Sequence, residues 1–143
     1  MSDSIATWVI AGFEIVAALG IVAYWFTWFR EPHDEPWLPD GYVDHEVPFV
    51  YTDTILAIVL VAAAALQVTE AQPGAIAVLV SDSRPVGDSL GLIAAGMLAF
   101  LGILDLVYFA RTGLFKREHG GVINVGVVTG VLLLSIILFL RFV

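Results

Sequence analysis

The fold is decided by residues 5–29, which read IATWVIAGFEIVAALGIVAYWFTWF and contain a single charged residue, Glu14. About 20 apolar residues in a helix are enough to cross the hydrocarbon core of a bilayer. Three further apolar runs of similar length follow at residues 50–68, 90–110 and 122–142. The four runs make up most of the 143 residues and explain the mean hydropathy of +0.93. We therefore predict an all-α integral membrane protein, a four-helix transmembrane bundle that forms one domain over the whole chain.

A proline-rich, acidic loop joins the first and second predicted helices. Four prolines fall within residues 30–49, and this density rules out a continuous helix there. The same stretch carries eight acidic or histidine side chains: Glu31, His33, Asp34, Glu35, Asp40, Asp44, His45 and Glu46. Imidazole and carboxylate groups together suit Zn²⁺ or another divalent cation, which makes His33, Asp44 and His45 candidate metal ligands. A solvated acidic loop is the alternative, because no spacing matches a known metal signature such as HExxH.

The composition excludes several classes of function. The chain has no cysteine, which excludes thiol–disulfide chemistry and thiolate metal sites. A formal net charge of −8 with a single lysine argues against nucleic-acid partners, which require basic patches. There is neither a histidine pair at matched depth nor a phosphate-binding loop, so we expect no haem, nucleotide or thiol-based cofactor. The acidic, lysine-poor composition indicates a high-salt environment, with an acidic loop for a specific ligand as the alternative.

The basic residues predict an orientation in the membrane. Two loops, the first and the third, share one side and carry Arg30, Arg111, Lys116 and Arg117. The opposite side has Arg84 and Arg141. Basic residues are enriched in cytoplasmic loops. We therefore expect these two loops in the cytoplasm, both termini outside, and the protein in the plasma membrane. Its expected partners are the lipid bilayer and either further copies of the chain or another membrane protein.

The link between the second and third predicted helices contains a short apolar segment. Residues 75–80 are too few to span a bilayer, so we predict a short interfacial segment there. Residues 81–87 then form a loop, with Asp88 or Ser89 as the N-cap of the next helix.

Polar residues converge on the end of the bundle that carries the first and third loops. Asp53 lies near the start of the second predicted helix, and Asp105 lies six residues before Arg111 in the third. An acid inside a membrane helix is costly and normally faces a partner or a wet cavity. We predict a polar pocket at this end, with these candidate binding residues: Asp53, Asp105, Asn124, Tyr51, Tyr108 and Arg111. The alternatives are that Asp53 and Asn124 are helix N-caps, and that Asp105 has a polar partner for packing alone.

Glu14 is an acid deep inside the first predicted helix. Alanines lie one turn away from it on both sides, and such small neighbours indicate that it faces other helices. No lysine or arginine is found at this depth in the other predicted helices. We expect Glu14 to hydrogen-bond a backbone carbonyl, Thr129 or Ser135, and to lie deeper along the path of an ion that enters the polar pocket.

The fourth predicted helix contains Gly126-Val-Val-Thr-Gly130, a GxxxG pattern. In apolar helices this spacing lets two backbones approach closely. We predict that it packs inside the bundle, and a contact between two copies of the chain is the alternative.

The sequence supports three hypotheses about function. The leading hypothesis is a membrane protein that binds, and transports, a cation or small ligand through the polar pocket as one protomer of an oligomer. The second is an accessory subunit of a larger membrane complex, in which buried acids pair with a partner helix. The third, and the less favoured, is an interfacial metal-dependent enzyme that acts on a lipid or isoprenoid with the histidines and acids of the loop.

Overall fold

The computed structural model describes residues 2–72, 79–81 and 84–143. The elements are α1 (Ser2–Trp28), α2 (Tyr42–Glu46), α3 (Phe49–Glu70), β1 (Leu79–Ser81), β2 (Arg84–Pro85), α4 (Val86–Thr112), the 3-10 helix η1 (Arg117–His119) and α5 (Gly121–Phe142). Within this described part, four helices are long and apolar enough to cross a membrane. They cover the four apolar runs of the sequence, so the prediction of four long helices is confirmed.

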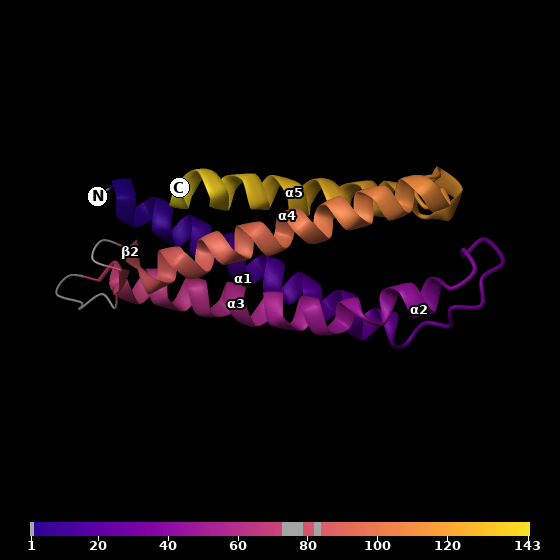
Figure 1. Ribbon diagram of the computed structural model, residues 1–143, viewed down its shortest axis with the longest axis horizontal. Coiled ribbons are helices and arrows are strands. Elements are labelled where there is room, and N and C mark those ends of the chain that lie inside the picture. The colour runs from indigo at the N-terminus through magenta and orange to yellow at the C-terminus, as the bar shows by residue number, and fades with distance from the viewer. Residues whose placement is uncertain (1, 73–78, 82–83) are drawn as a thin grey trace.

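The four long helices lie side by side, and the chain runs back and forth along them (Figure 1). Both termini and the β1–β2 strands lie at one end, which we call the termini end. The α1–α2 loop, α2 and the α4–α5 connection lie at the other, which we call the loop end. In sequence order, α1 packs on α3, α3 on α4, and α4 on α5, whereas α1 and α5 have no comparable contact. Each end of the bundle therefore carries one end of each long helix.

Prolines decide where the helices near the loop end begin. The short helix α2 lies between Pro39 and Pro48, and α3 begins directly after Pro48. Proline is well tolerated at the first turn of a helix because its fixed φ suits the helix and its missing N–H would be unpaired there anyway. Asp53 is consequently one turn inside α3, and the prediction that it is an N-cap is wrong.

The start of α4 also differs from the prediction. The helix begins at Val86, immediately after Pro85, so Asp88 and Ser89 lie in its first turn and neither is the N-cap. The Ser89 hydroxyl instead donates a hydrogen bond to the Pro85 carbonyl at 3.1 Å. Of the predicted interfacial segment at residues 75–80, only residues 79 and 80 are described, and they belong to β1, which pairs antiparallel with β2.

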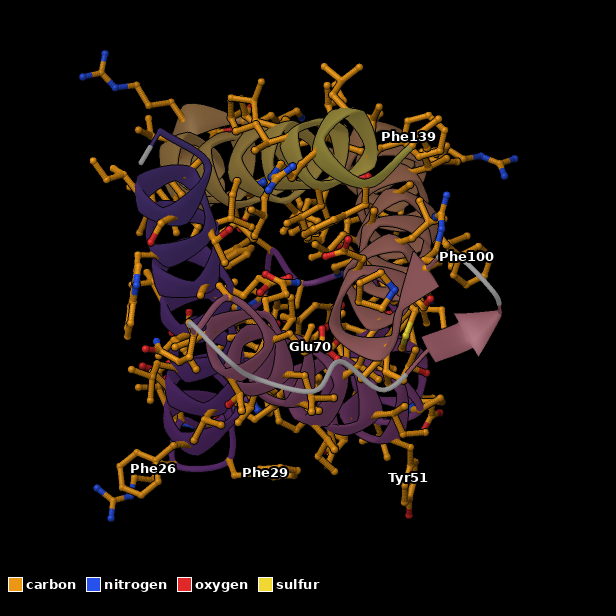
Figure 2. All side chains as sticks on the ribbon, turned by 90° about the vertical axis from the view of Figure 1, so that its left-hand side faces the viewer. Phe26, Phe29, Tyr51, Glu70, Phe100 and Phe139 are labelled. Atoms are coloured by element: carbon orange, nitrogen blue, oxygen red, sulfur yellow. The ribbon has the colours of Figure 1, made fainter. Side chains whose placement is uncertain are left out.

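Apolar side chains fill the middle of the bundle and also cover its outer surface. Leu56, Leu60, Leu98 and Leu138 are at most 2% exposed, and alanines of α3 and α4 fill the space between them. Large aromatic side chains such as Phe100 and Phe139 project away from the bundle (Figure 2). An apolar surface around a core with small residues is the pattern expected of helices that pack within lipid.

The glycines divide into two groups by what surrounds them. A Cβ atom added to Gly102 of α4 would lie 2.8 Å from a methyl group of Leu132, so this glycine allows α4 and α5 to approach closely. A Cβ atom added to Gly126 or Gly130 would meet no heavy atom within 4 Å among the described residues. The prediction that the GxxxG pattern of α5 packs inside the bundle is therefore wrong, because both glycines face outward.

Candidate functional site

Three carboxyl groups from three different elements lie near one another at the loop end. Glu46 of α2, Asp53 of α3 and Asp105 of α4 are close enough to interact electrostatically. The structure thus brings together Asp53 and Asp105. These are the two acids whose positions along their helices predicted them at this end. Glu46 was not predicted as a site residue, because the surrounding prolines conceal the short helix α2. This helix buries the Glu46 side chain to 6% exposure.

Aromatic side chains from the end of α1 hold two of these carboxyl groups. Trp25 Nε1 donates a hydrogen bond to Asp53 Oδ2 at 2.9 Å, and the Tyr24 hydroxyl donates one to Glu46 Oε2 at 3.1 Å. Among the described residues, no lysine or arginine forms an ion pair with any of the three acids. The loop end therefore holds three carboxyl groups, two of which are oriented by aromatic donors, and none of which is paired with a lysine or arginine among the described residues.

We expect Trp25→Phe to destabilise the protein more than Trp8→Phe. The first change removes the hydrogen-bond donor to the partly buried Asp53 carboxylate, which costs about 1–3 kcal/mol of the free energy of unfolding. Trp8, also on α1, is 53% exposed and serves as the matched control. Unfolding in mixed detergent micelles measures both variants. Trp25 is 7% exposed, so equal losses would show that neither its hydrogen bond to Asp53 nor the packing of its indole ring stabilises the protein.

Three other predicted site residues do not line this acidic cluster. Tyr51 is 73% exposed and projects away from the bundle (Figure 2). Arg111 is exposed in the last turn of α4. Asn124 donates from Nδ2 to the Leu114 carbonyl at 2.7 Å, so it fixes the α4–α5 connection. It is not an N-cap either, since α5 begins three residues earlier.

The candidate metal ligands of the loop are not brought together. His33 stacks on Trp28, with ring centroids 4.0 Å apart, and His45 stacks on Tyr108, with centroids 3.6 Å apart. Asp44 is exposed. Within residues 2–72, 79–81 and 84–143, no group of three or more histidine and acidic side chains is arranged to hold a metal ion. The two histidines instead pack the loop and α2 onto aromatic rings of α1 and α4.

Glu14 lies toward the termini end and is fully buried, at 0% exposure. Gln67 of α3, itself 4% exposed, donates from Nε2 to Glu14 Oε1 at 3.2 Å and to the Gly87 carbonyl at 3.3 Å. The expected partners of Glu14 were wrong. Ser135 donates its hydroxyl to a backbone carbonyl of α4, and Thr129 is exposed. A carboxamide in the last turns of α3 is thus the group that orients Glu14.

Several buried oxygen atoms around Glu14 have no hydrogen-bond partner within the described part of the chain. They are Glu14 Oε2, Gln67 Oε1 and Glu70 Oε1. The other oxygen of Glu70 accepts a hydrogen bond from the Gly87 amide at 3.3 Å. Buried polar atoms are nearly always paired, and an unpaired one costs about 1–3 kcal/mol. Three unpaired acceptors in one region indicate a place that suits a hydrogen-bond donor.

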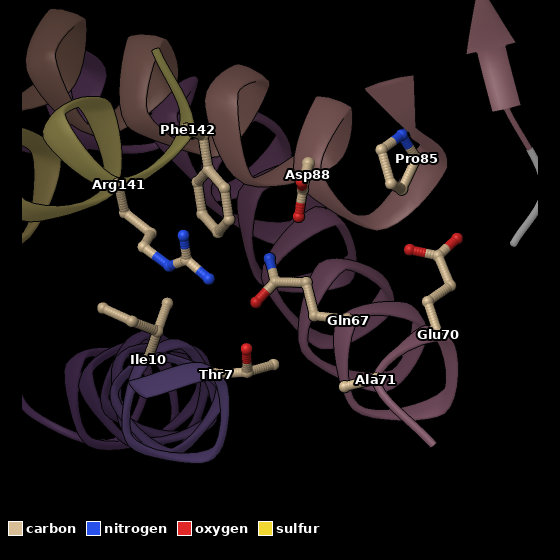
Figure 3. Close-up of a pocket in the computed structure, with 9 residues that line it drawn as sticks. All are labelled: Thr7, Ile10, Gln67, Glu70, Ala71, Pro85, Asp88, Arg141 and Phe142. Atoms are coloured by element: carbon tan, nitrogen blue, oxygen red, sulfur yellow. The ribbon is translucent and has the colours of Figure 1, made fainter. Parts of the chain in front are cut away.

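A partly enclosed cavity of about 190 Å³ lies at this end and is bounded by all four long helices. Its lining residues are Thr7, Ile10, Gln67, Glu70, Ala71, Pro85, Asp88, Arg141 and Phe142. Figure 3 shows Arg141 extending from α5 toward Gln67, while the Asp88 carboxylate points from α4 into the same space. The cavity therefore has acidic and amide groups on the α3 and α4 walls and a guanidinium group on the α5 wall.

The end of α5 is held in place by two contacts that position Arg141. Arg84 of β2 donates from a guanidinium nitrogen to the Phe142 carbonyl at 3.0 Å. The Phe142 ring, 7% exposed, packs directly over Gly91 of α4. A carbonyl at a helix C-terminus lacks a partner within the helix, and a cation there is favourable. These contacts fix the direction from which the Arg141 side chain enters the cavity.

A packed apolar layer separates the two polar ends. On α3, Asp53 and Gln67 are 14 residues apart, which corresponds to about 21 Å along a helix. Leu56 and Leu60 lie between them and belong to the same buried apolar cluster as Leu98 of α4. Glu14 is therefore not deeper along one polar path from the loop end, as expected, but belongs to a second polar region beyond this layer.

The cavity residues Gln67, Glu70, Asp88 and Arg141 were not predicted as site residues. Each is a polar side chain in the first or last turns of an otherwise apolar helix, and all four fall at the same end. Their shared position at one end of four apolar helices is the signal in the sequence that could have located them, as it does for Asp53 and Asp105 at the other end. Comparisons with models of protein families, with curated proteins and with solved structures gave no significant match.

Proposed function

We propose that the four long helices span a lipid bilayer and that the protein binds a small positively charged group in the termini-end cavity, as the first step of transport. The observation that carries this proposal is Glu14. Its side chain is fully buried, one carboxylate oxygen has no partner among the described residues, and the amide bound to its other oxygen lines the cavity.

Glu14 lies in the interior of an apolar helix, where a carboxyl group is energetically unfavourable. An acid in the interior of a membrane helix costs about 2.5–3.5 kcal/mol on insertion scales, and such residues normally mark a ligand or ion pathway. The hydrogen bond from Gln67 satisfies only one of the two carboxylate oxygens. A cationic group in the cavity would supply the opposite charge, and an ammonium group would also supply hydrogen-bond donors for the unpaired acceptors.

The acids at the loop end support transport rather than binding alone. Glu46, Asp53 and Asp105 form a second cluster of carboxyl groups, without a lysine or arginine partner among the described residues, on the far side of the apolar layer. Carboxyl groups at both ends of one bundle offer oxygen ligands to a cation at each end. The packed leucines between them would prevent free leakage, so passage would require a conformational change of the helices.

The test is a thermal melt of the detergent-purified protein in methylammonium chloride, with sodium chloride added to hold the ionic strength constant. A ligand that binds only the folded state stabilises it by about 2.7 kcal/mol at a hundredfold excess over Kd. We expect a saturable rise of the melting temperature that is lost in Glu14→Gln and kept in Glu31→Gln, since Glu31 is exposed. No rise in the wild-type protein, or an equal rise in Glu14→Gln, would refute the proposal.

A second candidate function is that of a subunit in a larger membrane assembly. The outward-facing Gly126 and Gly130 favour it, because GxxxG faces allow helices of separate chains to pack closely. Co-purification from native membranes after gentle solubilisation would test this function. A partner that is lost when both glycines are replaced by leucine would support it, and a chain that purifies alone from those membranes would count against it.

A further inference from the structure

We infer that the ligand of the termini-end cavity is a small zwitterion, with its ammonium group toward Gln67 and the acids and its carboxylate group toward Arg141. This inference rests on the proposed function, which requires only a positive group in the cavity. It adds the chemical class of the ligand and assigns Arg141 as the residue that selects it.

The cavity walls carry charged side chains of both signs. Glu70 of α3 and Asp88 of α4 line one part of the cavity, and Arg141 of α5 lines another. Glu14 interacts electrostatically with Asp88 from behind Gln67. The cavity is thus bounded by groups of both signs.

These opposite charges do not satisfy one another. Among the described residues, Arg141 has no ion pair with Glu70, Asp88 or Glu14. Its guanidinium group has a distant contact with the Phe142 ring, 5.8 Å from the centroid. Arg141 is an exposed residue that lines the cavity, so its charge is solvated and available to a ligand that enters from outside. A ligand that carries both charges would pair with each wall without moving the helices.

The unpaired hydrogen-bond acceptors determine how the ligand would be oriented in the cavity. Gln67 Oε1 is buried without a hydrogen-bond partner, and Gln67 lines the cavity opposite Arg141 (Figure 3). An ammonium group has three donors and suits this acceptor together with the nearby carboxylates. A guanidinium group is a planar, two-pronged donor that suits a carboxylate. The two ends of the cavity therefore recognise the two ends of a zwitterion.

Size limits the ligand further. The cavity volume is about 190 Å³, and since a cavity of about 150 Å³ can hold benzene, the ligand is limited to roughly ten non-hydrogen atoms or fewer. Glycine has an ammonium and a carboxylate separated by a single carbon, and methylammonium and acetate each carry one of these two groups. These three molecules are therefore matched probes for the recognition of both charges.

The experiment measures binding of glycine, methylammonium and acetate to the purified full chain by the saturable shift of the melting temperature at constant ionic strength. We expect glycine to bind about tenfold or more tightly than either single-charge probe. Arg141→Gln should reduce glycine binding to the level of methylammonium, and Arg141→Lys should restore part of the preference. Arg111→Gln, which removes an exposed arginine at the loop end, is the control and should change nothing.

The possible outcomes separate this inference from the proposed function. Equal binding of methylammonium and glycine, with both lost in Glu14→Gln, would overturn the zwitterion and leave the cation site standing. Tighter glycine binding that is unchanged in Arg141→Gln would overturn the role of Arg141. Absence of any saturable shift in the wild-type protein would overturn both. The melting temperature of each variant without ligand shows whether it is folded, so a folding defect is recognised directly.

Discussion

Replacing Leu60 by alanine is expected to lower the free energy of unfolding by about 2 kcal/mol, because it opens a cavity in the apolar layer between the two polar ends. Leu60 is 0% exposed and packs among leucines of α3, α4 and α5. In a bilayer or micelle the surroundings of the helices are themselves apolar. The free energy of transfer of the leucine methyl groups from these surroundings to the protein interior is therefore small. The loss comes instead from dispersion contacts, which the surrounding side chains cannot fully recover.

The matched control for this variant is Leu140→Ala on α5. Leu140 is 76% exposed and lies on the outer surface, so its truncation should change the free energy of unfolding by only a few tenths of a kcal/mol. Unfolding in mixed detergent micelles, with far-ultraviolet circular dichroism as the readout, compares the two variants. Similar values for Leu60→Ala and Leu140→Ala would contradict a tightly packed barrier between the ends.

Helix number and the depth of polar residues could be predicted from the sequence, but the direction of each side chain could not. Four apolar runs of about 20 residues leave few alternatives to four long helices. Position along a helix then follows from residue number, so Asp53 and Asp105 fall at the same end. The helices are apolar on every side, and such a pattern does not show which face is inward. Depth alone therefore predicts neither that Tyr51 points outward nor that the partner of Glu14 is Gln67 of α3.

Local contacts explain the remaining differences. The short helix α2 and the burial of Glu46 depend on how the chain folds back between prolines. No periodic pattern in the sequence predicts this local fold. Gly91 faces inward and Gly126 faces outward because of how α4 and α5 are rotated about their axes, although both glycines occur in apolar helices with small residues nearby. Rotation is set by packing with neighbouring helices, and this information is distributed over the whole bundle.

Gly91→Ala is expected both to destabilise the protein and to abolish the ligand response of the termini-end cavity. A Cβ atom at this position would overlap the Phe142 ring and lie 3.0 Å from Gln67 Nε2. Overpacking of this kind typically costs about 1–3 kcal/mol. The ring can relieve the overlap only by moving, and Phe142 is adjacent to Arg141 in the last turn of α5. The substitution should therefore disturb both the guanidinium and the amide that face each other across the cavity.

Gly126→Ala is the matched control, because it adds the same methyl group where nothing lies within 4 Å. Alanine is a better helix former than glycine by about 0.5–1 kcal/mol, so this variant should be at least as stable as the wild-type protein and should keep the full glycine-dependent shift. Melting curves of the two variants with and without glycine make the comparison. If Gly91→Ala melted like Gly126→Ala and still responded to glycine, the close contact between Phe142 and α4 would not hold the cavity in shape. The selection of a zwitterion by Arg141 would then lose its structural basis, because the position of this arginine depends on that contact.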